Sequence, residues 1–215
     1  KAPEPTAVPQ PTAVPEPTKV PLEVPFETQW VSSPHNDKTA EAFKHWDAAD
    51  PKEVPASCAT CHSTTGYQDF LGADGSAAGK VDKNQPIGQT IQCVACHNEQ
   101  ASTLTEVAFP GKDPDGNPLV AHNVGDSGRC MVCHQGRASK ASVDAQIEKF
   151  KITDLDAVVA PIKDDKGNDV NFGFINIHYF AAAATLYGTE VKGGYEYEDK
   201  TYDAKNQHVT GFAEC

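Results

Sequence analysis

The sequence predicts a mainly α-helical fold with extensive irregular loops and little sheet. Hydrophobic residues make up 39% of the 215 residues, and Gly and Pro each occur 16 times. This is a thin supply of apolar side chains for a core of this size. The pentapeptide C-x-x-C-H occurs three times, separated by turn-forming clusters of Gly, Asp, Asn and Ser. We therefore expect short helices and long loops wrapped around apolar groups that are not side chains.

The three pentapeptides are the strongest signal in the chain. Two thiols three positions apart lie on one turn, where they can form thioethers to the two vinyl groups of one porphyrin, and the adjacent His can bind the iron. Zinc held by four thiolates is the alternative, but it does not explain why a His follows the second Cys each time. The sequence thus predicts a multihaem cytochrome c fold with three covalent haem c groups. The cysteines are Cys58, Cys61, Cys93, Cys96, Cys130 and Cys133, and the proximal ligands are His62, His97 and His134.

Five further histidines are candidates for the sixth ligands of the three irons. The single methionine, Met131, lies inside the third pentapeptide and cannot reach the other face of that haem. Haems with two His ligands and low reduction potentials are therefore expected. In order of preference, the candidates are His178, His35, His45, His208 and His122.

Four helical stretches are predicted from caps and apolar spacing. The first spans residues 38–46 and is capped by Asp37, with Phe43, Trp46 and the edge of His45 facing inward. The second follows the second pentapeptide and runs to about Leu104. The third covers residues 142–150.

The fourth and clearest helix is expected between Asn176 as N-cap and Gly188 as stop. It would place His178 in the first turn, above a face of small residues, where the helix dipole keeps the imidazole neutral. Loops are expected at residues 63–92 and 108–128, and a small hairpin at residues 193–202.

The chain divides by composition into two parts. Residues 1–25 are dense in Pro and predict an extended stalk, which would allow a membrane tether. Residues 26–215 are expected to form the haem-binding domain, incomplete at its C-terminus. Cys215 has no partner within a C-x-x-C-H unit, so we expect it to open a fourth haem motif; a free or intermolecular thiol is the alternative.

Charge narrows the classes of partner. The formal net charge of −12 argues against nucleic acid and anionic membrane surfaces and favours cationic or neutral redox partners. No apolar run approaches the length of a membrane-spanning helix. Arg129 and Arg137 flank the third pentapeptide, where they could pair with haem propionates or lie as solvated surface charges.

Several stretches from residue 28 onward resemble the large exported multihaem c-type cytochromes. The resemblance implies electron transfer outside the cytoplasm, in the periplasm or at the cell surface, with other redox proteins or cytochromes as partners and no catalytic residue. Two alternatives stay open: an oxidoreductase acting on a small nitrogen or sulfur oxyanion, and a subunit of a haem filament or homo-oligomer. The matching stretches are Trp30-x-x-Ser33-Pro-His35, Ala42-Phe43-x-His45-Trp46, Val54-Pro-Ala-Ser-Cys58-Ala-x-Cys61-His62-Ser63, Arg129-Cys-Met-Val-Cys-His-Gln-Gly-Arg137 and Asn176-Ile-His178-Tyr.

Overall fold

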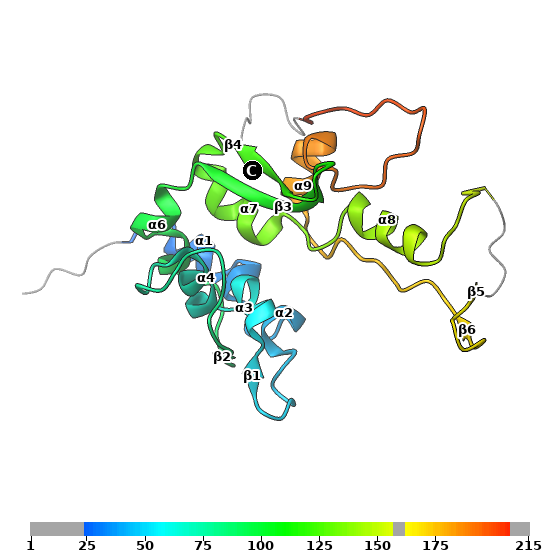
Figure 1. Ribbon diagram of the computed structural model, residues 1–215. Coiled ribbons are helices and arrows are strands. Elements are labelled where there is room, and N and C mark those ends of the chain that lie inside the picture. The colour runs from blue at the N-terminus through cyan, green and yellow to red at the C-terminus, as the bar shows by residue number, and fades with distance from the viewer. Residues whose placement is uncertain (1–23, 157–161, 207–215) are drawn as a thin grey trace, which may run out of the picture.

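The computed structural model describes residues 24–156 and 162–206 (Figure 1). Residues 1–23, which hold nearly all of the expected stalk, lie outside the described residues. So do His208 and Cys215, and with them the predictions of a further haem ligand and a fourth motif.

Short helices and long connections dominate the described residues, which confirms the predicted fold class. Within residues 24–156 and 162–206, the strands form three antiparallel two-stranded ladders, β1–β2, β3–β4 and β5–β6. The helices are α1 (Glu27–Val31), η1 (Pro34–Asn36), α2 (Glu41–Lys44), α3 (Ala56–His62), α4 (Thr64–Leu71), α5 (Cys93–Cys96), α6 (Glu99–Ser102), η2 (Gly125–Ser127), α7 (Gly128–His134), α8 (Lys140–Lys149), α9 (Ala182–Tyr187) and η3 (Gly188–Glu190). The strands are β1 (Glu53–Val54), β2 (Gln85–Pro86), β3 (Glu106–Lys112), β4 (Pro118–His122), β5 (Ile162–Lys163) and β6 (Asp169–Val170).

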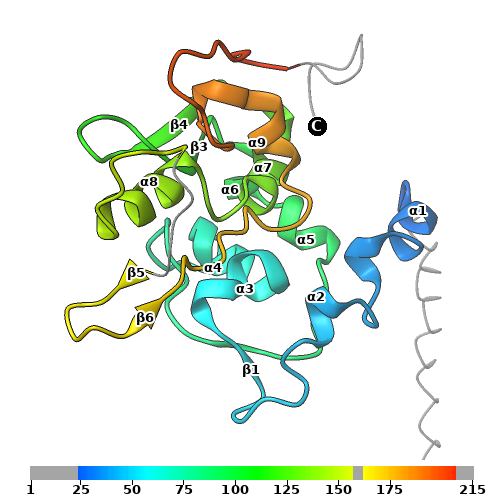
Figure 2. The same ribbon diagram turned by 90° about the vertical axis from the view of Figure 1, so that its right-hand side faces the viewer.

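The core lies where α4, α7 and α9 meet the β3–β4 hairpin. Figure 2 shows α3, α4, α7 and α9 grouped in the body of the molecule, with α1 and α2 to one side. Tyr67, Met131 and Val191 are its largest fully buried apolar side chains, and many other members are alanines. Cys96 and Cys133 pack against this core. Helices α5 and α7, which carry the second and third pentapeptides, are thus fixed to the core on one side.

The predicted loop at residues 63–92 is wrong over its first part, where the chain forms α4. The Ser63 hydroxyl accepts a hydrogen bond from the Gly66 N–H at 3.0 Å and so caps the helix. Gly66 packs directly on α3: a Cβ added there would lie 2.6 Å from the Cβ of Ala59 and still closer to the Ala59 carbonyl oxygen. The Ser-Thr-Thr-Gly run that suggested a turn is instead a cap followed by a close helix contact.

The predicted loop at residues 108–128 is also wrong in part, because β3 and β4 form a hairpin there. Their register pairs Glu106 with His122 and becomes irregular between Ala108 and Lys112. Asp113 closes the turn by accepting the N–H groups of Asp115 and Asn117 at 2.9 and 2.8 Å. Pro110 and Gly111, which argued against a strand, lie within the irregular stretch.

The predicted helix at residues 176–188 is wrong in its first half. Helix α9 begins at Ala182, while His178 and Phe180 have left-handed backbones with φ of 83° and 54°. The Asn176 side chain accepts the His178 N–H at 2.8 Å, so it closes a local turn instead of capping a helix. Gly188 does end α9.

Three smaller differences concern the ends of the domain. Helix α2 is shorter than predicted, because Asp37 binds the Thr39 N–H and hydroxyl in a turn that precedes it. Phe43 is buried as expected, whereas His45 is exposed. Residues 193–202 form no strand, so the predicted hairpin is wrong, and α8 matches its prediction closely.

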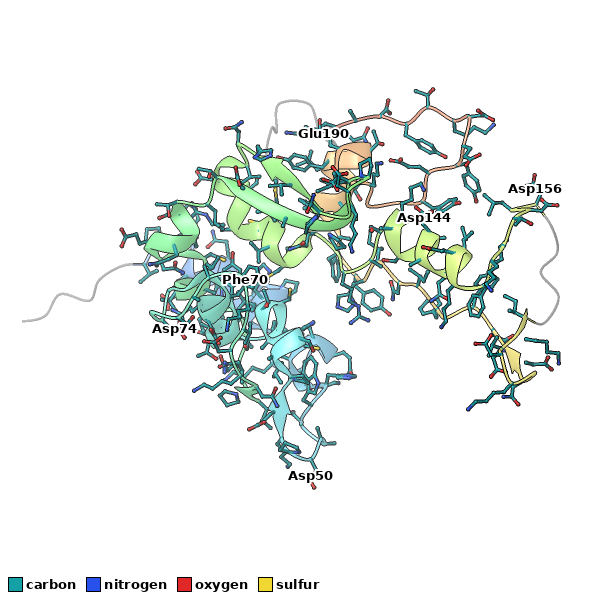
Figure 3. All side chains as sticks on the ribbon, in the orientation of Figure 1. Asp50, Phe70, Asp74, Asp144, Asp156 and Glu190 are labelled. Carbon is teal, nitrogen blue, oxygen red and sulfur yellow. The ribbon has the colours of Figure 1, made fainter. Side chains whose placement is uncertain are left out.

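Apart from the buried Asp69, acidic side chains are distributed over the outside of the molecule. Figure 3 shows Asp50, Asp74, Asp156 and Glu190 at well-separated points of the periphery. With a net charge of −12, the surface presents a negative field to approaching partners.

Candidate haem centres

Each C-x-x-C-H pentapeptide occupies one helical turn. The first site (Cys58, Cys61 and His62) lies on α3, the third site (Cys130, Cys133 and His134) on α7, and the second site (Cys93, Cys96 and His97) on α5 and its C-cap. Cysteines three residues apart on a helix share one face. None of the six cysteines forms a disulfide bond. Every site therefore presents two thiols side by side and a His one residue further on, as covalent attachment of a porphyrin requires.

Two of the proximal histidines have a fixed tautomer. Nδ1 of His62 lies 2.8 Å from the Ala42 carbonyl oxygen, and Nδ1 of His134 lies 2.7 Å from the Phe180 carbonyl oxygen. A carbonyl can only accept, so Nδ1 donates in both cases. This leaves Nε2 as the lone-pair nitrogen, which is the arrangement commonly found behind metal-binding imidazoles.

The fold brings a second histidine to each of these two rings. The ring centroids of His62 and His178 are 5.9 Å apart, and those of His134 and His35 are 6.1 Å apart. Two imidazoles that bind one metal ion from opposite sides, with metal–nitrogen bonds of about 2 Å, have centroids about 6 Å apart. The residues present thus fit a haem iron between His62 and His178 and another between His134 and His35.

The electrostatics of these rings suit iron binding. Burial lowers the pKa of His62, His178 and His35 below the usual range for histidine, and nearby rings or Arg137 add to the effect. All three are therefore neutral at neutral pH, the form that ligates metal. Nδ1 of His178 is buried without a hydrogen-bond partner in the described part of the chain, which fits a site completed by a group other than these side chains.

His178 is positioned by the third site. The Arg137 N–H donates to the Ile177 carbonyl at 2.9 Å, and His134 Nδ1 donates to the Phe180 carbonyl. Gly136, with φ of 82°, permits the close approach, since a Cβ there would lie 2.8 Å from the Ile177 carbonyl oxygen. The partner of the first site's His62 is thus held against the helix of the third site.

His35 is positioned by the loop that precedes the second site. The Ile91 N–H donates to the His35 carbonyl at 2.9 Å. The Trp30 indole N–H donates to the Ile91 carbonyl, also at 2.9 Å. The partner of His134 is therefore anchored two residues before Cys93.

The second site is not completed in the same way. His97 is exposed, and no ring of the described residues is paired with it. His45 and His122 are exposed too, and their Nδ1 atoms face the carboxylates of Glu41 and Glu106 at 2.9 and 2.8 Å. The structure does not bring either of them to a proximal His as a partner across an iron.

The two arginines differ in their surroundings. Arg129 is paired with Asp126, and its guanidinium lies 3.5 Å from the Cys96 carbonyl oxygen. Arg137 is exposed and contributes to lowering the pKa values of His62 and His178, so its charge lies near the first site. Propionate pairing stays a prediction for both.

Tyr67 is a site residue that the sequence analysis missed. It is 1% exposed, and its hydroxyl donates to the Arg129 carbonyl at 2.7 Å. Burial raises its pKa, and the Cys133, Cys96, Cys130 and Cys61 thiols add to this effect. The phenol therefore stays protonated among cysteines of all three sites. Its position six residues after Cys61, in a stretch that reads as loop, gave no signal for this role.

Comparison with known proteins agrees with these features. The family described as cytochrome c7 and related cytochrome c matches residues 41–147, which include all three pentapeptides. Residues 41–147, just under half of the chain, thus match the multihaem c-type cytochromes, which hold haem c covalently.

Among individual proteins, the chain is similar to two C-type polyheme cytochromes of Geobacter sulfurreducens. It is 27% identical to OmcB over 195 residues, in both strain DL-1 / KN400 and strain ATCC 51573, which covers 78% of this chain. It is 27% identical to OmcC over 194 residues, 77% of this chain. The chain spans only 22–23% of the length of these relatives. No solved structure matches it. No helix in the described residues is long and apolar enough to cross a membrane.

Proposed function

We propose that this chain transfers electrons through three covalently bound haems. The main observation behind this proposal is that His62 pairs with His178 and His134 with His35. The distances between the ring centroids suit two ligands on one iron. An iron with both axial positions filled by protein has no place for a substrate. The haem supplies one-electron chemistry, while the chain holds geometry and excludes water.

The groups that hold the histidine rings in place support this function. Backbone carbonyls fix the tautomers of His62 and His134. Imidazoles held in this way need little rearrangement when the iron changes oxidation state. The negative surface favours cationic or neutral redox partners.

The haem content tests the first part of the proposal. We expect the denatured protein to exceed its polypeptide mass by three haems, attached at the six cysteines of the three sites. Absorption after alkaline pyridine treatment should give the same stoichiometry. A zinc-containing chain without covalent porphyrin would end this interpretation.

The spin state tests the second part. Two low-spin ferric haems are expected from the paired histidines, and electron paramagnetic resonance (EPR) and visible spectra distinguish them from five-coordinate haem. The electron-transfer proposal is contradicted if the first and third sites are high-spin in the protein as isolated.

A second candidate function rests on the second site. His97 has no ring partner within the described residues, and an iron bound there on one side only could take a small ligand. An oxidoreductase would show this as a high-spin fraction of one haem that shifts on adding nitrite or sulfite. The acidic surface weighs against an anionic substrate, so electron transfer is preferred.

The cellular setting follows from the covalent haems. We propose that the chain works outside the cytoplasm, in the periplasm or at the cell surface, where c-type haem is installed. The Pro-rich residues 1–25 would serve as its spacer or tether. His45, His122 and His208 would be available to haems of other modules or subunits, as in a filament.

A further inference from the structure

The thiols of the first and third sites lie against each other. The Cys61 and Cys133 thiols lie close enough to interact with each other. The Cys133 thiol also lies 3.5 Å from the carbonyl oxygen of Thr60, the residue before Cys61. In a c-type haem, each cysteine sulfur is bonded to the edge of the porphyrin. Adjacent sulfurs therefore bring the edges of two porphyrins together at this point.

The other cysteine of the third site faces the second site. The Cys130 and Cys96 thiols lie close enough to interact electrostatically. Arg129, which precedes Cys130, places its guanidinium 3.5 Å from the Cys96 carbonyl oxygen. The N-terminal end of α7 thus lies beside the second site, and its C-terminal end lies beside the first.

Tyr67 fills the space among these cysteines. Its hydroxyl donates to the Arg129 carbonyl at the start of α7, and its ring is almost fully buried. No hydrogen bond within the described ranges joins residues 58–62 directly to residues 93–97; the link between the two segments runs through Thr64, whose hydroxyl donates to the Thr90 carbonyl and accepts the Gln92 N–H. The first and second sites both meet α7, with Tyr67 between them.

We propose that the third site is the central one, so that the three sites follow the spatial order first, third, second. The chain order would instead suggest the second site as the middle one. Electrons exchanged between the first and second sites then pass the third. Each step moves one electron, so the donor site is oxidised as the acceptor site is reduced and no further reactant is needed. This inference rests on the proposed function, because it requires all three sites to hold haem.

Three two-haem proteins test the order. In each, both cysteines of one site are replaced by alanine, and the three variants serve as controls for one another. The measurement is spin–spin broadening of the ferric EPR signals, which falls steeply with the distance between irons. The replaced pairs are Cys58 with Cys61, Cys93 with Cys96, and Cys130 with Cys133.

Broadening should persist in the proteins that lack the first or the second site and be lost in the protein that lacks the third. Persistent broadening without the third site, or its loss without the second, would overturn the proposal. Visible spectra of the remaining haems check that each variant is folded. Failure of the proposed function would differ, because unmodified protein would then lack low-spin or covalent haem.

A measurement on the complete protein avoids deletion of a haem. His35→Met should raise the potential of the third site by replacing an imidazole with a thioether, so that this site is reduced first. Its reduction removes its paramagnetism, and the signals of both other sites should narrow together. In His178→Met, reduction of the first site should narrow the third signal and leave the second unchanged. The proposed order is contradicted if the EPR signal of the second site narrows when the first site is reduced and does not narrow when the third site is reduced.

Discussion

His178→Ala is expected to convert the haem of the first site from low-spin to high-spin while all three haems stay attached. The substitution removes the ring that lies 5.9 Å from His62, and Ala offers no ligand in its place. Attachment depends on Cys58 and Cys61, which are unchanged. Ferric EPR should show one more high-spin haem in each molecule than in the unmodified protein, and the intact mass should fall only by the side-chain difference.

Two companions make this experiment specific. Tyr179→Ala alters the neighbouring, exposed residue of the same segment and should keep the low-spin spectrum. Added imidazole should restore the low-spin signal of His178→Ala, because it can take the place of the deleted ring. A low-spin first site in His178→Ala, before imidazole is added, would remove His178 from the ligand set.

The same reasoning separates the two pairs. His35→Ala should affect the haem of the third site, because the His35 ring faces His134 at 6.1 Å. The double variant should contain two more high-spin haems than the unmodified protein, since each histidine serves a different iron. This additivity is expected even though His178 is held by the third site, because the hydrogen bond from His134 to Phe180 involves backbone that remains.

The sequence predicted the attachment sites and ranked His178 and His35 first among the distal candidates, but for His178 it used a wrong structural reason. A short motif defines its chemistry locally, so three C-x-x-C-H units could be recognised without a fold. The conformation at His178 depends on contacts with Gly136 and Arg137, about 40 residues earlier in the chain. Helix periodicity carries no information about such contacts, and the spacing was read as a regular helix.

The missed elements have a related physical cause. Ser63 and Gly66 were read as turn residues, yet one caps α4 and the other allows its contact with α3. Tyr67 was overlooked for the same reason, because a buried phenol among three sites is visible only once α4 is placed. Local propensities are weak where tertiary contacts decide the conformation.

The contact between α3 and α4 is the most sensitive point of the packing around the first site. Any side chain at Gly66 would collide with the backbone of Ala59, which lies between Cys58 and Cys61. Backbone atoms cannot rotate away, so the helices must separate. Overpacking of this kind typically costs about 1–3 kcal/mol, which exceeds the gain of up to about 1 kcal/mol from replacing Gly by Ala in a helix.

Gly66→Ala is therefore expected to lower the free energy of unfolding, by up to about 2 kcal/mol after this gain is subtracted. Thermal unfolding followed by far-ultraviolet circular dichroism measures the change as a lower Tm. Gly194→Ala is the matched control, since a Cβ there meets no atom within 4 Å and its φ is outside the left-handed region. Because α3 carries His62, the Gly66 variant should also show a partly high-spin first site, whereas Gly194→Ala should not. Equal Tm values for Gly66→Ala and the unmodified protein would contradict the close contact between α3 and α4.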